Sequence, residues 1–157
     1  PEIRFRGFTD AWEQRKLGTL VRIGSGRDYK HLGKGDIPVY GTGGYMVSVD
    51  QALSEAEDAV GIGRKGTINK PYILKAPFWT VDTLFFVLPQ KELITLSFLF
   101  TTIQRINWGL KDESTGVPSL SKTAIESTDV KIPSIDEQRK IGNLFLQIDE
   151  LITLHQR

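Results

Sequence analysis

The stretch FWTVDTLFFVLPQKELITLSFLFTTIQRI, residues 78–106, changes from a strand pattern to a helix pattern within one short segment. Residues 78–88 are rich in aromatic and β-branched side chains, which favour a strand, and Pro89 ends this run because proline cannot donate a ladder hydrogen bond. Gly109 stands where the C-cap of a following helix would lie. The apolar residues that recur at helical spacing are Leu96, Leu99, Phe100, Ile103 and Ile106. The stretch therefore predicts a strand followed by a helix.

The rest of the chain is predicted to form short strands joined by polar turns. We expect a loop or short helical turn around Trp12 over residues 8–16, and a loop over residues 111–121 that leads into a helical turn at residues 122–127. Strands are expected at residues 17–23, 37–40, 45–49, 59–62, 72–74 and 130–132. The expected fold class is α/β of the mixed α+β kind, a sheet-rich body followed by a C-terminal helix.

That C-terminal helix has the clearest sequence signature. Ser134 and Glu137 match a capping box, in which the serine hydroxyl caps the helix and the glutamate side chain reaches back to the N-cap backbone. Apolar residues at a/d spacing extend over two heptads of this helix. This pattern is compatible with a coiled coil and equally with a surface helix packed on its own domain. The apolar positions are Ile141, Leu144, Ile148 and Leu151, and Phe145 and Ile152 broaden the stripe.

Length and composition exclude several classes of protein. At 157 residues the chain has the size of one domain rather than two. It has no cysteine, which excludes disulfides and thiolate metal sites, and its histidines, His31 and His155, have no second ligand at metal spacing. No apolar run reaches the about 18 residues of a membrane span. We therefore expect a cytoplasmic protein without a metal or other cofactor, and the start at Pro1 and the end within a helical pattern favour a fragment of a longer protein.

The net charge is only +1, but the charges are unevenly distributed along the chain. Residues 1–35 hold eight basic and four acidic side chains, a net of +4, and residues 62–75 hold four basic side chains without any acid. Local basic patches on a near-neutral chain favour contact with a polyanion through one face. Ordinary solvated lysines and arginines would give the same composition, so charge alone does not decide between the two.

The motifs of phosphate-binding enzymes are incomplete in this chain. GIGRKG, residues 61–66, matches the dinucleotide-binding pattern G-x-G-x-x-G, which needs a helix directly after it so that the helix N-terminus meets the pyrophosphate. Residues 67–71 favour an extended segment closed by proline, so a nucleotide site is not expected. The turn at residues 41–44 lacks the lysine of a phosphate-binding loop, and the acidic residues are scattered. We predict no catalytic residue.

Four loops instead combine glycine with hydroxyls, cations or aromatic rings, at residues 25–30, 40–45, 63–70 and 114–119. Arginine grips guanine with two hydrogen bonds, asparagine does the same for adenine, and small hydroxyls hold phosphates. Each loop alone is more typical of an ordinary turn between strands, and four of them in one small domain reduce that difference without deciding between ordinary turns and DNA binding. The candidate DNA-binding residues are Ser25, Arg27, Tyr29, Lys30, Tyr40, Thr42, Gly43, Arg64, Lys65, Thr67, Asn69, Ser114, Thr115 and Gly116.

Segments along nearly the whole chain resemble, in the expected order, the landmarks of the specificity subunit of type I restriction-modification systems. They are FTDAWEQRKLG (8–18), GDIPVYGTGG (35–44), GIGRKG (61–66) with WTVDT (79–83), STGVPSLS (114–121) and IPSIDEQRKI (132–141). The resemblance implies a non-catalytic chain that reads one half of a split duplex DNA target. Residues 1–133 would form the target-recognition domain, and residues 134–157 would begin a spacer or dimerisation helix.

The same resemblance implies the partners. Methyltransferase (modification) subunits would methylate adenine with S-adenosylmethionine, and a separate restriction subunit would translocate and cut the DNA. The family's full subunit has two recognition domains and this chain has one. Two alternatives therefore stay open: the chain pairs with a second copy or a second half through the C-terminal helix, or it is an excised module that binds DNA weakly.

Two other functions remain as alternatives. A protein-interaction module acting through its C-terminal helix would have a partner on that helix and no affinity for DNA. A small enzyme, either a nuclease or a nucleotide-binding protein, would be stabilised by a metal ion or a nucleotide. The scattered acids and the missing helix after residue 66 argue against the enzyme.

Overall fold

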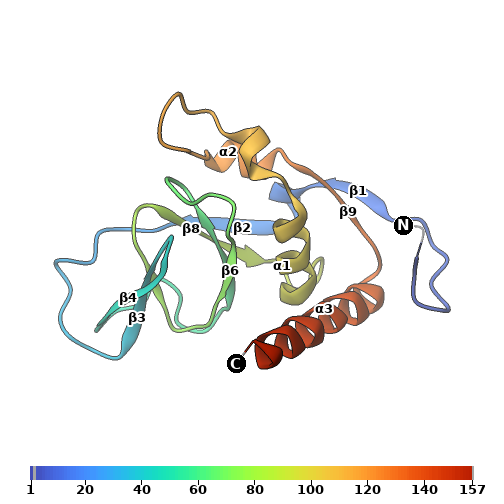
Figure 1. Cartoon of the computed structure of the whole chain (residues 1–157), viewed down its shortest axis with the longest axis horizontal. Helices are drawn as coiled ribbons and strands as arrows, with labels where there is room; N and C mark the ends of the chain where they lie inside the picture. Colours follow the sequence, from blue (N-terminus) through green and yellow to red (C-terminus); the bar gives the residue numbers. More distant parts are fainter. Residues whose placement is uncertain (2, 157) are drawn as a thin grey trace.

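The computed structural model describes residues 1 and 3–156 and distributes the strands among three small sheets (Figure 1). The largest sheet has the order β2–β8–β5–β6 and is antiparallel throughout. A second sheet has the order β4–β3–β7, and a two-stranded sheet pairs β1 with β9. The strands are β1 (Glu13–Lys16), β2 (Val21–Ser25), β3 (Ile37–Gly41), β4 (Gly44–Val49), β5 (Ala59–Gly63), β6 (Tyr72–Leu74), β7 (Trp79–Thr80), β8 (Leu84–Pro89) and β9 (Asp129–Ile132). The helices are α1 (Leu96–Arg105), α2 (Lys122–Glu126) and α3 (Ile135–His155), with 3-10 helices at Leu17–Thr19 and Trp108–Lys111.

The core lies on both faces of β8, whose six residues are all buried. Successive side chains of a strand point to opposite faces. Phe85 and Val87 pack with α1 and the segments around it, whereas Leu84, Phe86 and Leu88 pack in a second cluster with β6 and Phe78. A strand covered on both faces needs a continuous apolar run rather than an alternating one, and this explains the composition of residues 84–88.

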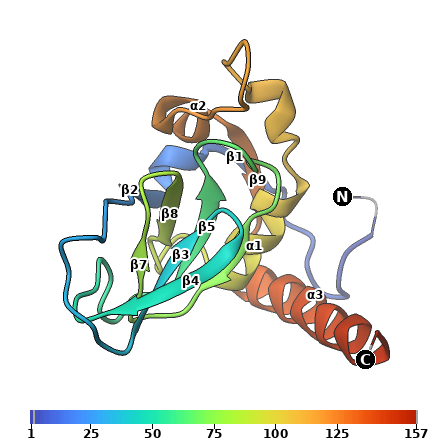
Figure 2. The ribbon, with the colours of Figure 1, turned by 60° about the vertical axis from the view of Figure 1, so that its left-hand side comes forward.

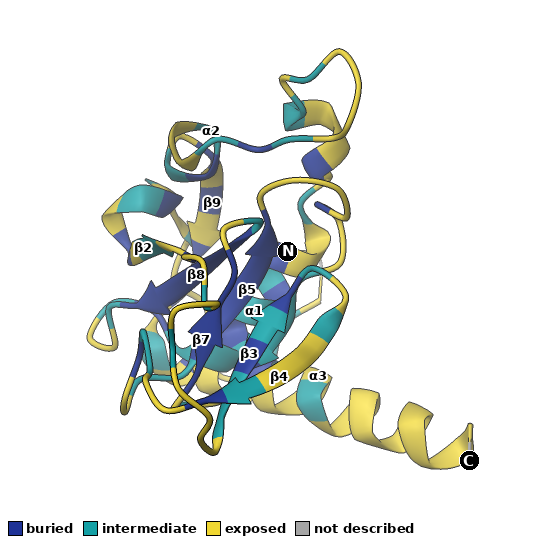
Figure 3. Ribbon diagram, turned by 90° about the vertical axis from the view of Figure 1, so that its left-hand side faces the viewer, coloured by how far each residue is buried: buried dark blue, intermediate teal, exposed yellow. Residues whose placement is uncertain are grey.

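Helix α3 is anchored to the body by its first two turns. Gln138 is buried and bridges three backbone groups, accepting from Thr95 N and donating to the carbonyls of Leu93 and Pro133. One turn later, a side chain on Gly142 would lie 2.2 Å from Ser97 Oγ, so only glycine permits α3 to approach α1 this closely. The helix is largely exposed beyond this point (Figure 3).

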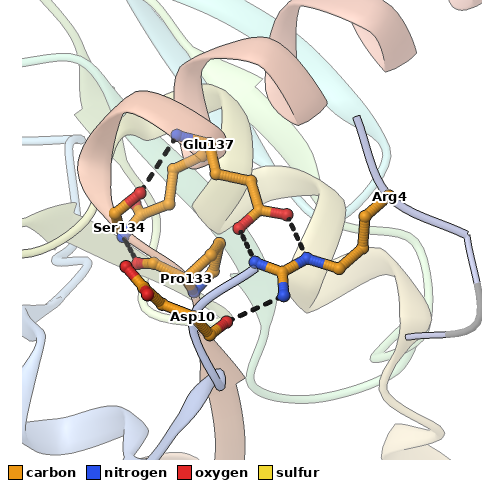
Figure 4. A network of polar contacts seen from close by, with 6 residues as sticks. Arg4, Asp10, Pro133, Ser134 and Glu137 are labelled. Atoms are coloured by element: carbon orange, nitrogen blue, oxygen red, sulfur yellow. Dashed lines mark hydrogen bonds and ion pairs between the residues drawn. The ribbon is translucent and has the colours of Figure 1, made fainter. Parts of the chain in front are cut away.

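The N-terminal segment also holds the start of α3, as Figure 4 shows. The Ser134 hydroxyl accepts from Glu137 N at 3.5 Å, which confirms Ser134 as the N-cap. The Glu137 carboxylate does not complete the capping box. It instead binds the Arg4 guanidinium, which also donates to the Asp10 carbonyl at 2.8 Å. A cation forms a stronger hydrogen bond with a buried carboxylate than a neutral N–H does, which explains why the long-range partner is preferred.

Other local predictions need correction. Residues 13–16, expected as loop or helical turn, form β1 because β9 pairs with them, and the expected strand at 17–23 begins as a 3-10 helix. Residues 78–88 are not one strand: the chain turns between β7 and β8. Gly109 is not a C-cap, because α1 ends at Arg105 with Ile106 as its cap and Gly109 lies in the next 3-10 helix. The mixed α+β class is confirmed.

Among the residues described, no helix is long and apolar enough to cross a membrane. Within the same residues, no group of three or more histidine, aspartate or glutamate side chains is placed to hold a metal ion.

Candidate nucleic-acid interface

The strand registers bring the predicted loops to one end of the sheets. Strand β3 runs parallel to β7, with Tyr40 opposite Thr80, so the turn after β3 and the turn after β7 lie side by side. In the large sheet, the end of β2 and the end of β5 both pair with the start of β8, through Ser25 with Phe85 and Gly63 with Leu84. We call this set of segments, residues 25–30, 41–44, 63–70, 80–84 and 114–121, the loop edge. In Figure 1, the β3–β4 hairpin lies at the left of the body and α3 at the lower right. Figure 2 shows the hairpin at the front.

Residues 80–84, the central turn, hold three of the predicted loops through backbone hydrogen bonds. Thr80 O and Leu84 O accept from Arg27 N and Gly26 N, at 2.9 and 3.0 Å, and so fix the loop after β2. Val81 N donates to Tyr40 O at 3.0 Å, and Thr83 O accepts from Arg64 N at 2.7 Å. The loops after β2, β3 and β5 are therefore positioned by one five-residue segment.

Gly26 is required by this arrangement. A Cβ atom at this position would lie 1.9 Å from Val81 O and 2.6 Å from Thr80 O, both of them backbone atoms that cannot rotate away. The indole Nε1 of buried Trp79 adds a further link by donating to Arg27 O at 2.9 Å. The Arg27 side chain is exposed while its backbone is fixed at both the N–H and the carbonyl.

The loop at residues 114–121 joins the loop edge through the loop that follows β5. Gly66 N donates to Pro118 O and Leu120 N donates to Arg64 O, each at 2.9 Å, and Lys65 forms an antiparallel bridge with Ser119. The loop is closed at its base by Asp112, whose Oδ1 accepts from the backbone N–H of Ser119 at 2.9 Å and of Ser114 at 3.0 Å. The Ser119 N–H, with Ser114, lowers the pKa of the Asp112 carboxyl, because these hydrogen bonds favour the charged form.

Ten of the fourteen candidate residues are exposed, namely Ser25, Arg27, Lys30, Gly43, Arg64, Lys65, Thr67, Asn69, Thr115 and Gly116. Tyr29, Tyr40, Thr42 and Ser114 are half buried, and the Ser114 hydroxyl lies below the surface with no hydrogen-bond partner among the residues that the structure describes. None of the four cations in this set, Arg27, Lys30, Arg64 and Lys65, forms an ion pair within the part of the chain that the structure describes. By contrast, Arg22 and Lys75 are paired with Glu57 and Asp58, so their charge is locally neutralised.

The same edge carries residues that were not among the fourteen candidate DNA-binding residues, although Tyr45 belongs to the selected loop at residues 40–45 and residues 79–83 to a family landmark. The central turn was hidden within the apolar run of residues 78–88, where only the polar pair Asp82-Thr83 indicated a break. Tyr45 and Met46 follow the hairpin turn and are exposed, whereas Tyr72 packs against Tyr40 and donates to Gly41 O at 2.5 Å. Burial, with the nearby Tyr40 hydroxyl, raises the pKa of Tyr72 to about 12, so this tyrosine stays neutral and keeps its donor.

The sheets fix the backbone of several loops and leave the cations, hydroxyls and glycines of these loops exposed. This arrangement defines a recognition module. Loops of this kind are where binding residues concentrate. As expected from the sequence, no helix follows the G-x-G-x-x-G segment, so it lacks the geometry of a dinucleotide site.

The chain belongs to the family described as the type I restriction modification DNA specificity domain, whose model matches residues 9–157. The match confirms the family resemblance that was inferred from the sequence. A search of curated proteins found no match.

Solved structures share this fold at low sequence identity. The specificity subunit of a type I restriction-modification system from M. genitalium superposes with a TM-score of 0.78 at 14% identity, over 96% of this chain and 42% of that one. The specificity subunit from Thermoanaerobacter tengcongensis gives 0.64 at 16% identity, over 98% and 40%. A chain from a study of assembly and conformational transition in a type I system gives 0.72 at 15% identity, over 99% and 43%. The present chain thus spans less than half the length of these relatives.

Proposed function

We propose that the loop edge binds duplex DNA and that the chain reads one half of a split target for a type I restriction-modification system. The observation that carries this proposal is the convergence of four loops on the central turn and on each other, with exposed cations that form no ion pair within the described residues. Fixed loops reduce the entropy lost on binding, and cations without intramolecular partners are available to phosphates. The family membership supports the same function.

Two kinds of contact are proposed within the loop edge. Hydroxyls and backbone N–H groups around Ser25, Thr42, Thr115 and Gly116 would hold phosphates and fix the register on the duplex. Arg64 and Asn69 have the side chains suited to reading base edges, guanine for arginine and adenine for asparagine. The Arg64 guanidinium lies 5.7 Å from the centre of the Phe85 ring, which restrains the side chain while the residue stays exposed.

The chain would contribute recognition and no chemistry. Modification subunits would methylate the adenine and a restriction subunit would translocate and cut, all in the cytoplasm. Residues 1–133 are proposed as the recognition domain and residues 134–157 as the start of the spacer or dimerisation helix. In support of the latter, α3 exposes an apolar stripe that its own domain leaves uncovered, formed by Leu144, Phe145, Ile148, Leu151 and Ile152. This stripe would pair with a second copy or a second half.

The first test is selection from a randomised duplex DNA pool at low salt, with sequencing of the bound fraction. Enrichment of a short motif would establish the recognition function and give the half-site. Salt-sensitive retention without enrichment would show phosphate contact alone and contradict base reading by this chain. No retention would contradict the proposal and favour an interaction module that acts through α3.

A further inference from the structure

The end of the β3–β4 hairpin exposes three consecutive apolar side chains. Tyr45, Met46 and Val47 are 63%, 50% and 37% exposed. Because neighbouring side chains in a strand point to opposite faces, this end of the hairpin is uncovered on both faces. Strand β4 is also the outer strand of its sheet, and Figure 3 shows its exposed surface at the front of the molecule. A soluble domain rarely exposes such a group without a function.

The Tyr45 ring is held in place although it is exposed. It stands edge-on to the Tyr40 ring, with 6.5 Å between ring centres, and Tyr40 stands edge-on to Tyr72 at 6.1 Å. The Tyr45 hydroxyl lies 3.2 Å from Ser48 Oγ, and Tyr72 is tied to the backbone at Gly41. A rigid aromatic ring gains contact area at low entropic cost, so the hairpin is preorganised for a flat, apolar partner.

The position of the hairpin indicates which partner this is. Tyr40, on the strand before the turn, accepts from Val81 of the central turn, so the hairpin belongs to the loop edge and neighbours the loops of Arg27 and Arg64. The turn is narrow, since Gly41 pairs with Gly44 across it, and it is open on its outside, since a Cβ atom on Gly43 or Gly44 would meet nothing within 4 Å. An apolar tip beside exposed cations suits a polymer that has anionic groups on the outside and flat apolar faces inside, which is the chemistry of stacked bases between phosphates.

We propose that the β3–β4 hairpin enters a groove of the bound duplex and that Tyr45, held by Tyr40, packs against a base and unstacks one base step. This proposal rests on the proposed function and adds a mode of reading to it. The free energy of unstacking depends on the sequence, and pyrimidine–purine steps unstack most easily. The hairpin would therefore impose a sequence preference at a step without any hydrogen bond to its bases.

The test uses the full 157-residue chain and a duplex carrying the half-site obtained by selection, with 2-aminopurine placed in turn at each purine. With the wild-type chain we expect fluorescence to rise at one step, because the base loses a stacking neighbour. Tyr45→Ala is expected to abolish the rise and to weaken binding by about 5- to 100-fold. Tyr45→Phe keeps the ring and is expected to match the wild type within about twofold.

Leu110→Ala is the matched control, since Leu110 is an exposed apolar residue outside the loop edge and its loss should change neither signal. Equal melting temperatures for all variants would show that the comparison is free of folding defects. Wild-type affinity and fluorescence in Tyr45→Ala would overturn the proposal, and so would binding by the wild type without a rise at any step. If the wild type binds no duplex at all, the proposed function itself fails, an outcome distinct from the other two.

Discussion

The guanidinium of Arg4 binds the carboxylate of Glu137 through two hydrogen bonds, 2.9 Å from Nε to Oε1 and 2.6 Å from Nη2 to Oε2. Glu137 is 1% exposed, so this carboxylate depends on Arg4 for its neutralisation. The pair ties the N-terminal segment to the first turn of α3, and Lys140 adds a second contact by lying over the Phe8 ring. The direction in which α3 leaves the body is thus fixed partly by residues at the opposite end of the chain.

Arg4→Ala is expected to lower the melting temperature by about 3–8 °C, because it leaves a buried carboxylate without its cation. Arg139→Ala, which removes an exposed pair with Asp136 on the same helix, should shift it by no more than about 1 °C. Thermal unfolding followed by circular dichroism measures both. Adding Glu137→Gln to Arg4→Ala should restore part of the loss, and no restoration would contradict a role for the charge.

Gly26→Ala should destabilise the chain by about 1–3 kcal/mol, because its methyl group would overlap the backbone carbonyl of Val81. Gly43→Ala is the matched control, since nothing lies within 4 Å of its Cβ position, and its effect should stay within about 0.5 kcal/mol. Denaturant titration gives both values. If Gly26→Ala and Gly43→Ala had the same free energy of unfolding, the loop after β2 would not be held against the central turn.

Arg64→Ala is expected to weaken binding to the selected duplex by about 1–3 kcal/mol and to relax the preference at one base pair, if Arg64 reads a base. If Arg64 holds a phosphate, all sequences should weaken together and the salt dependence should fall by about one charge. Arg22→Ala removes the same charge from the far end of β2, where Glu57 already pairs with it, and serves as the control. Unchanged affinity of Arg64→Ala at low salt would rule out both roles.

The loop at residues 114–121 should loosen in acid. The pKa of Asp112 is lowered in the folded chain by the N–H groups of Ser119 and Ser114, so the unfolded chain binds the proton more tightly. The contribution of Asp112 to stability is therefore fully present above its ordinary pKa of about 4 and is lost as the pH falls through the lower, folded value. NMR titration of the Ser114 and Ser119 amides measures this change. Asp112→Asn should remove the pH dependence of these amide signals. Signals that stay constant with pH in the wild type would contradict the predicted loosening of the loop.

Ile148→Asp should reduce self-association of the chain, if the α3 stripe pairs with a second copy. Gln147→Asp introduces the same charge on an adjacent exposed position outside the stripe and should have little effect. Sedimentation velocity across a range of concentrations compares the two. A wild-type chain that stays monomeric at every concentration would contradict pairing with a second copy.

Local patterns were sufficient for much of the fold and for the choice of loops. Helical spacing identified α1, and the cap at Ser134 with the apolar stripe identified α3, because both signals depend only on neighbours within about one turn. The strands at β3 to β6 were predicted nearly at their observed bounds. The four loops were selected by residue type, and the structure places all of them along one edge.

Contacts between distant residues decided the rest. Residues 13–16 form a strand only because β9 pairs with them. The Glu137 side chain does not cap the helix, because it binds the positively charged Arg4 guanidinium instead of a neutral backbone N–H. The break at residues 81–83 within an apolar run is set by the loops that bind to it. Which residues favour helix, strand or turn follows from the residue types alone, since these preferences are local. Which loops meet depends on the folded chain, because backbone hydrogen bonds such as Arg64 N to Thr83 O join groups of the same chemistry in every residue and leave no signal in side-chain identity.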